Sequence, residues 1–260
     1  MPPTLGNPAV WAFTQARALV WMLILVRMTG LLATFPGFGQ ARIPVRIRLS
    51  LGLLLAVVLV PLVPLPRELP TSMYDLTGFM LTEFAAGLVM GLSVSWIVDI
   101  VAFAGQLMDT QMGFSFVQFL DPVSAHPVSI SGSLLTQLTL VFIFVCNLHH
   151  QMILAVVASY RILPLGEALP MKPLLILSSM GLILVRGFQL AFPVMLTLFL
   201  VDVLEGVSGK FMPQLQLIQL SFPIKITIGL TVLGVVLSQF GPWLQPLLEA
   251  APREALRFLR

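Results

Sequence analysis

The sequence predicts an all-α integral membrane protein of about six long, partly bent hydrophobic helices. Two observations predict this class. Of the 260 residues, 58% are hydrophobic and only 10% are charged, whereas soluble domains carry about 25% charged residues. The mean hydropathy is +0.99, and apolar runs long enough to cross a bilayer recur along the whole chain. Too few charges remain to cover a water-exposed surface, so we expect a single membrane domain over residues 1–260.

Proline and glycine divide the chain into apolar segments, because proline lacks an amide donor and glycine loosens the backbone. A bilayer helix needs about 20 mostly apolar residues. Six segments meet that length: residues 18–35, 49–65, 76–108, 130–160, 174–204 and 222–248. No positive charge precedes Arg17, so the first segment lacks the basic start of a signal peptide, and we expect it to be retained.

Two of these segments are irregular for simple spanning helices. The third would measure about 50 Å as a straight helix, more than the roughly 30 Å hydrocarbon core. The fifth carries Pro193 near its middle, which predicts a kink or a hairpin. Lys and Arg number four on one set of loops and six on the other set and the tail, so the positive-inside rule does not orient the chain.

Charged residues also occur inside the predicted membrane segments. They are Arg27, Glu83, Asp99, Arg186 and Lys225. A charge at mid-bilayer costs about 2.5–3.5 kcal/mol on insertion scales, so we expect these side chains to face protein, water or the interface. Depth alone suggests Arg27 or Arg186 as the partner of Asp99.

The third segment carries a stripe of small and acidic residues at every fourth position. Its members are Glu83, Gly87, Gly91, Ser95 and Asp99. Small residues at this spacing let two helix backbones approach closely, so the stripe predicts helix packing with buried charge. An ion or proton path through Glu83 and Asp99 is the alternative interpretation.

Nothing in the sequence indicates an enzyme, a metal site or a cofactor. The histidine pair His149 and His150 is adjacent on a predicted helix, where neighbouring side chains point about 100° apart. Zinc-protease and nucleophile-elbow motifs are absent, and the single cysteine, Cys146, excludes an internal disulfide. The net charge of +3 provides no basic face for nucleic acid.

The connection QMGFSFVQFLDP, residues 111–122, is aromatic although connections between helices are normally polar. Gly113 gives it freedom to turn, and Asp121-Pro122 ends it. A narrow apolar neck excludes water and ions by dewetting, so such a loop can close a pore. Residues expected to form this plug are Met112, Gly113, Phe114, Phe116 and Phe119. Filling a gap between helices is the alternative role of these side chains.

Several stretches together resemble the FliR/SctT family of bacterial type III secretion export-gate proteins, and its flagellar members in particular. They are RMTGLLATFPGFGQARIPVRIRLSLGLLLA, AGQLMDTQMGFSFVQFLDP, FVCNLHH, SYRILPLG and MPQLQLIQLSFPIKITIGL. Residues that match the family pattern are Arg27, Pro36, Gly39, Pro44, Arg48, Asp121, Pro122, His149, Pro213, Gln214 and Pro223. The chain departs from the pattern at Leu148, where the family has glycine, and at Gln216, where many relatives have asparagine.

The resemblance implies bent helical hairpins in a hetero-oligomeric export gate of the bacterial inner membrane, at the flagellar basal body. Expected partners are FliP-like and FliQ-like subunits, a FlhB-like switch protein, membrane lipid and unfolded protein substrates in transit. The loop at 111–122 would plug the central pore, and no enzymatic activity or cofactor is implied. An injectisome gate subunit, a secondary transporter using Glu83, Asp99 and Arg186, and a purely structural scaffold remain alternatives.

Overall fold

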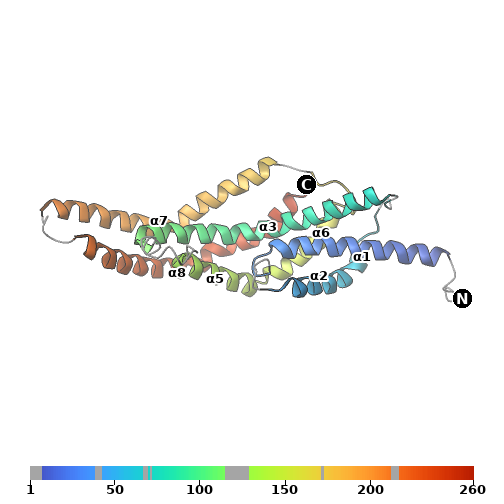
Figure 1. Cartoon of the computed structure of the whole chain (residues 1–260), viewed down its shortest axis with the longest axis horizontal. Helices are drawn as coiled ribbons and strands as arrows, with labels where there is room; N and C mark the ends of the chain where they lie inside the picture. The colour runs from blue at the N-terminus through green and yellow to red at the C-terminus, as the bar shows by residue number, and fades with distance from the viewer. Residues whose placement is uncertain are drawn as a thin grey trace. The chain divides into compact units, whose positions relative to one another are not determined.

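The computed structural model describes residues 8–38, 43–66, 70, 72–114, 129–170, 173–211 and 217–260. Within these ranges every regular element is a helix, which confirms the predicted all-α class. In chain order the elements are α1 (Pro8–Thr34), α2 (Val45–Leu59), the short 3-10 helix η1 (Val60–Leu62), α3 (Met73–Met112), α5 (Ile130–Val145), α6 (Leu148–Ile162), α7 (Pro173–Phe211) and α8 (Leu217–Arg257) (Figure 1).

The helices are long and apolar enough to cross a membrane several times. Five described stretches meet that criterion, and the pair formed by α5 and α6, bent at a short break, adds a sixth. The longest, α3, α7 and α8, have 40, 39 and 41 residues, which is about 60 Å each at 1.5 Å per residue. The predicted number of segments is therefore confirmed, and three of them exceed the thickness of a bilayer core.

The chain forms two compact units, and all but one of the boundaries between them fall within helices. Unit 1 consists of Met1–Ser95, Asn147–Leu175 and Leu248–Arg260. Unit 2 consists of Trp96–Cys146 and Ile176–Leu247. The long helices α3, α7 and α8 each contribute to both units, and the division at Asn147 coincides with the break between α5 and α6. That the whole chain acts as one membrane domain stays a prediction.

In unit 1, α1 is the central helix. Gly52 of α2 lies against α1, where a Cβ atom would meet Leu32, Leu25 and Thr29 at ordinary contact distances of 3.6–3.7 Å. The approach of α3 is much closer, because a Cβ at Gly87 or Gly91 would collide with the backbone of α1. The glycines of α3 therefore allow its backbone to approach α1 more closely than the backbone of α2 does.

In unit 2, α5, α7 and α8 pack around the C-terminal part of α3. The backbones of α3 and α5 approach so closely that a Cβ at Gly105 would collide with Gly132. Gly187 of α7 faces Phe103 and the Ile100 carbonyl of α3. On α8, Phe240 packs edge-on against Phe142 of α5, with ring centroids 6.0 Å apart. Small residues again permit close approach, and aromatic rings fill the wider gaps.

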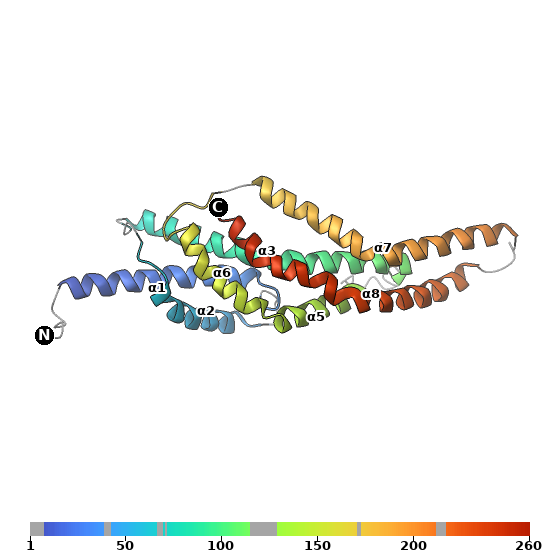
Figure 2. The same cartoon turned by 180° about the vertical axis from the view of Figure 1, so that it is seen from behind.

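The predicted irregularity of the fifth segment appears as a bend within α7. Pro193 lies inside this helix, and α7 changes direction near its middle in both views (Figures 1 and 2). Proline removes one backbone donor and its ring crowds the preceding turn, which is the usual cause of such a bend.

Asn147 marks the break between α5 and α6. Its φ angle is 54°, in the left-handed region, and among the described non-glycine residues it alone has a positive φ. Asparagine tolerates this conformation better than most residues. Leu148 stands where the family has glycine, and in this chain the preceding Asn147 adopts the left-handed conformation.

Large apolar side chains remain exposed along α2 and α7. On α2 they include Val45, Ile47, Leu54, Val57 and Val58, and on α7 they include Leu182, Leu184, Val185, Phe188, Phe199 and Leu200. Contiguous apolar surfaces of this kind face lipid or another protein chain.

Candidate functional site

A buried ion pair lies inside unit 1. Arg27 of α1 is fully buried, and Glu83 of α3 is 1% exposed. The Nε atom of Arg27 donates a hydrogen bond to Oε2 of Glu83 across 2.6 Å. Charge-assisted bonds of this kind are roughly twice as strong as neutral ones, so the pair ties α1 to α3 within the apolar interior.

The segment SYRILPLG, residues 159–166, surrounds this pair. The guanidinium donates through Nη1 to the Ser159 hydroxyl across 2.7 Å and through Nη2 to the Leu163 carbonyl across 3.2 Å. Its Cζ atom lies 3.8 Å from the centre of the Tyr160 ring, in cation–π geometry. The carboxylate also accepts a hydrogen bond from the Gly166 backbone.

We call this group the arginine cluster: Arg27, Glu83, Ser159, Tyr160, Leu163 and Gly166. It joins α1, α3, α6 and the turn that follows α6. A buried charge is tolerable only when it is paired and its remaining donors are bonded, and the cluster meets both conditions. The Tyr160 hydroxyl is buried without a hydrogen-bond partner among the described residues. The ion pair itself is closed to solvent and bonded within the cluster, so its chemistry is that of a fixed structural connection.

In the structure Arg27 does not pair with Asp99, the acid suggested by the positions of the two residues within their apolar segments. Its partner is Glu83 rather than Asp99, and Asp99 is exposed. Sequence reasoning also missed Ser159 and Tyr160, although both lie in a stretch noticed for its family resemblance. Since they are more than 130 residues from Arg27 in the chain, no helical spacing could have linked them to it.

The predicted stripe on α3 divides into two parts. Gly87 and Gly91 are buried against α1, in the arrangement that the packing interpretation describes. Ser95 is half-buried and Asp99 is exposed. Arg186, expected to be buried, is exposed on α7 and donates to Gln189 across 3.3 Å.

The remaining charge of the apolar segments, Lys225, belongs to the α7–α8 pair. Its ammonium forms ion pairs with Asp202 and, at 3.8 Å, with Glu205. Ser221 of α8 donates to Glu205 across 2.6 Å. These bonds hold the C-terminal part of α7 beside the N-terminal part of α8 (Figure 2).

The described part of the plug segment includes Met112, the last residue of α3. Its side chain is fully buried, and a Cβ at Gly229 of α8 would meet it at 2.7–3.0 Å. Met112 is therefore packed against α8 within this chain, and its membership of the plug stays a prediction. Gly113 follows with φ of 85°, which accounts for the glycine, and Phe114 is half-buried.

The described residues on the two sides of positions 115–128 are tied to each other within unit 2. Asp109, one turn before the end of α3, is 4% exposed. Its carboxylate accepts from the Ser129 hydroxyl at 2.6 Å and from the Ser131 backbone at 3.1 Å. Ser129 in turn caps α5 by accepting from the Gly132 backbone at 2.9 Å. Sequence analysis missed Asp109, whose signal was an acid one turn before the glycine of the loop.

Other predicted residues take varied positions. Pro36 is buried in the turn after α1, Pro44 precedes α2, Arg48 is half-buried in the second turn of α2, His149 is half-buried at the start of α6, and Pro223 is exposed on α8. Outside the described residues lie Gly39, Phe116, Phe119, Asp121, Pro122, Pro213 and Gln214. Their roles stay predictions.

Among the described residues, no group of three or more His, Cys, Asp or Glu side chains could hold a metal ion. The rings of His149 and His150 lie 4.8 Å apart at an angle of 50°. The described residues therefore provide the arginine cluster and the anchored plug segment as the two candidate sites.

Comparison of the whole sequence with known proteins gives matches to one family. Residues 18–251 match the family model described as bacterial export proteins, family 1. The flagellar biosynthetic protein FliR of Caulobacter vibrioides is 30% identical over 228 residues, covering 86% of this chain and 91% of that protein. FliR of Escherichia coli is 25% identical, covering 90% and 92%, and FliR of Bacillus subtilis is 28% identical, covering 84% and 86%.

Proposed function

The chain belongs to the family of bacterial export proteins, family 1, and on this premise we propose that it is a subunit of the flagellar protein export apparatus. The match over residues 18–251 carries this proposal. The relatives described above bear the name flagellar biosynthetic protein, which favours the flagellar apparatus over an injectisome. The protein acts here as a structural part of a channel rather than as an enzyme.

The partners are FliP-like and FliQ-like gate subunits in the bacterial inner membrane, with a FlhB-like protein docked on the gate. Support comes from α2 and α7, whose large apolar side chains remain exposed after the chain has folded. An obligate membrane subunit needs such faces for its neighbours and for lipid. The arginine cluster contributes indirectly for α2 alone, because it ties α1, against which α2 packs, to α3 and α6.

The loop at 111–122 closes the idle pore by placing aromatic side chains in its centre. Phe114, Phe116 and Phe119 supply the apolar bulk for a neck that excludes ions by dewetting. Support comes from the described residues before and after positions 115–128, because Asp109 bonds to Ser129 and Ser131 and Met112 packs against α8. A plug needs fixed ends and a tip free of specific polar partners, so that many substrates can displace it.

The plug is tested by changing Phe116 and Phe119 to glycine in the assembled gate. We expect the closed state to conduct small ions, because bulk is lost while the anchors remain. The control is Phe114→Leu, which keeps apolar bulk and should keep the gate closed. Closed-state conductance equal to that of the unchanged gate would show that these rings only fill space between helices.

The family role is tested separately by deleting the gene in its own bacterium and measuring flagellar filament protein in the medium. We expect export to stop while the protein accumulates inside the cell, and a plasmid copy to restore it. Continued flagellar export with loss of a different secreted set would instead assign the chain to an injectisome. Solute uptake by the purified chain alone would favour a transporter.

A further inference from the structure

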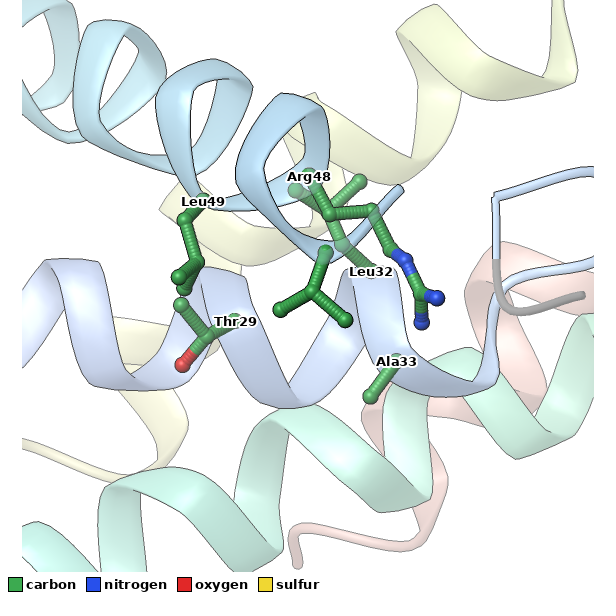
Figure 3. Close-up of a pocket in the computed structure, with 6 residues that line it drawn as sticks. Thr29, Leu32, Ala33, Arg48 and Leu49 are labelled. Atoms are coloured by element: carbon green, nitrogen blue, oxygen red, sulfur yellow. The ribbon is translucent and has the colours of Figure 1, made fainter. Parts of the chain in front are cut away.

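A pocket of about 180 Å³ opens between α1 and α2 in unit 1. Thr29, Leu32 and Ala33 of α1 and Val45, Arg48 and Leu49 of α2 line it. Figure 3 shows the side chains of Arg48 and Leu49 directed into the space above Thr29, Leu32 and Ala33. Arg48 is its one charged residue, so the pocket presents a cation at the rim of an otherwise mostly apolar space.

Arg48 has hydrogen-bond capacity that the described chain leaves unused. Its Nη2 atom donates to the Ile43 carbonyl across 3.2 Å. Its Nε atom is buried, and no described group accepts a hydrogen bond from it. No described carboxylate pairs with this guanidinium either. A half-buried guanidinium with an unbonded donor and no counter-charge is a receptor for an anionic oxygen.

A second, apolar cavity of about 160 Å³ is lined by α1, α2 and α6 and by the turn after α1. Leu32 of α1, Leu51 and Leu55 of α2, and Met152 of α6 are among the residues that line it. Leu32 borders both spaces. Arg48, Leu51 and Leu55 stand three and four residues apart, on one stripe of α2, so the cation stands at the head of the stripe whose leucines line the apolar cavity.

Along α2, the pocket at Arg48 lies at the expected depth of lipid headgroups, and the apolar cavity lies deeper, at the expected depth of acyl chains. The apolar span that includes α2 begins at Val45, which places Arg48 about 4.5 Å inside its start, at the depth where arginine reaches headgroups. Leu55 is about 10 Å further along the helix axis, toward the hydrocarbon. Val45 also belongs to the first turn of α2, where the positive end of the helix dipole adds to the attraction for an anion.

We propose that the α1–α2 groove of unit 1 binds one anionic phospholipid, with its phosphate on Arg48 and part of an acyl chain in the cavity around Leu55 and Met152. The occupant must be amphiphilic, since a free anion would leave the apolar cavity unfilled and a neutral hydrocarbon would leave the guanidinium unbonded. The exposed leucines and valines of α2 then continue as the lipid-facing surface beside the bound molecule. This inference does not depend on the role of the protein in export.

The test is native mass spectrometry of the full chain in mild detergent, titrated with phosphatidylglycerol and with phosphatidylcholine of the same acyl chains. We expect one phosphatidylglycerol to remain bound at concentrations where phosphatidylcholine is lost. Arg48→Gln should weaken phosphatidylglycerol binding about tenfold, as expected for one lost charge-assisted contact, and Arg48→Lys should restore part of it. The matched control is Arg46→Gln, an exposed arginine two residues away, which should change binding less than twofold.

The acyl-chain part is tested with a bulky side chain in the cavity. Leu55→Trp should reduce retention of both lipids, whereas Leu54→Trp, at a neighbouring position that is 63% exposed, should leave retention unchanged. Circular dichroism and gel filtration must show that each variant remains folded. If Arg48→Gln does not fold, Arg48→Met takes its place, and it too should weaken phosphatidylglycerol binding.

Three outcomes would overturn the proposal. Equal losses for Arg46→Gln and Arg48→Gln would mean that lipid senses only surface charge. Displacement of phosphatidylglycerol by millimolar inorganic phosphate would indicate a free-anion site. Loss of phosphatidylglycerol at the same concentrations as phosphatidylcholine would mean that the groove holds no anionic lipid and would leave it to a neighbouring protein subunit.

Discussion

At the scale of single residues, Arg27 is the position on which the interior of unit 1 depends most. Its charge is fully buried and reaches α3, α6 and the following turn through bonds to Glu83, Ser159 and Leu163. Sequence alone required that this arginine find a partner, because an unpaired charge in lipid is costly. The partner itself could not be predicted, since a side-chain contact between distant segments leaves no periodic signal.

Replacing one member of the Arg27–Glu83 pair should lower the stability of the chain more than replacing both. We expect Glu83→Ala to destabilise the chain by about 3–5 kcal/mol, because an uncompensated buried charge remains, and Arg27→Met with Glu83→Leu to recover part of that loss. The measurement is thermal unfolding in detergent. The control, Arg186→Met, removes an exposed arginine of another apolar segment and should cost less than about 1 kcal/mol. Equal costs for the single and double variants would show that the pair is not coupled.

At the scale of secondary-structure elements, glycines set the distance between α1 and α3. We expect Gly87→Ala to separate these helices and to lower stability by about 2 kcal/mol or more, because the new Cβ collides with the Arg27 carbonyl. Gly78→Ala is the matched control on the same helix, where a Cβ meets nothing within 4 Å, and it should be neutral or stabilising by up to about 1 kcal/mol. Unfolding in detergent measures both. A loss of stability at both glycines would contradict the packing account.

The connection from α3 to α5 depends on Asp109. Asp109→Ala removes the acceptor for Ser129 and for the Ser131 backbone, and we expect the start of α5 to fray, at a cost of about 1–3 kcal/mol. Hydrogen exchange of the amides at 130–133 should accelerate. Thr110→Ala, which removes only a bond to the Gln106 carbonyl on the same helix, should leave that exchange unchanged. Unchanged protection in both variants would mean that packing alone holds α5.

The elements illustrate what sequence pattern can and cannot predict. Segment number, the irregularity at Pro193 and the excess length of α3 followed from apolar run length and proline placement. The burial of Met112 did not, because it arises from Gly229 on α8, more than a hundred residues away. Local periodicity carries information about the face of a helix but not about which helix lies opposite.

At the scale of the whole molecule, composition was sufficient to predict the class of fold. A hydrophobic content of 58% is typical of a multi-pass membrane protein, and the described part of the chain is entirely helical in its regular structure. The division into two units was not predicted, because its boundaries pass through α3, α7 and α8 without any change in composition. The two units are defined by which helices pack together. Pairing between helices that are far apart in the chain could not be inferred from a single sequence.

The central claim concerns this scale: the protein is one subunit of a larger export gate. The most direct measurement is mild-detergent purification of the tagged chain from its native membrane, with mass spectrometry of the proteins that accompany it. The account predicts FliP-like and FliQ-like proteins in molar excess over the tagged chain. Recovery of a pure monomer or homo-oligomer, from membranes in which such proteins are present, would contradict it.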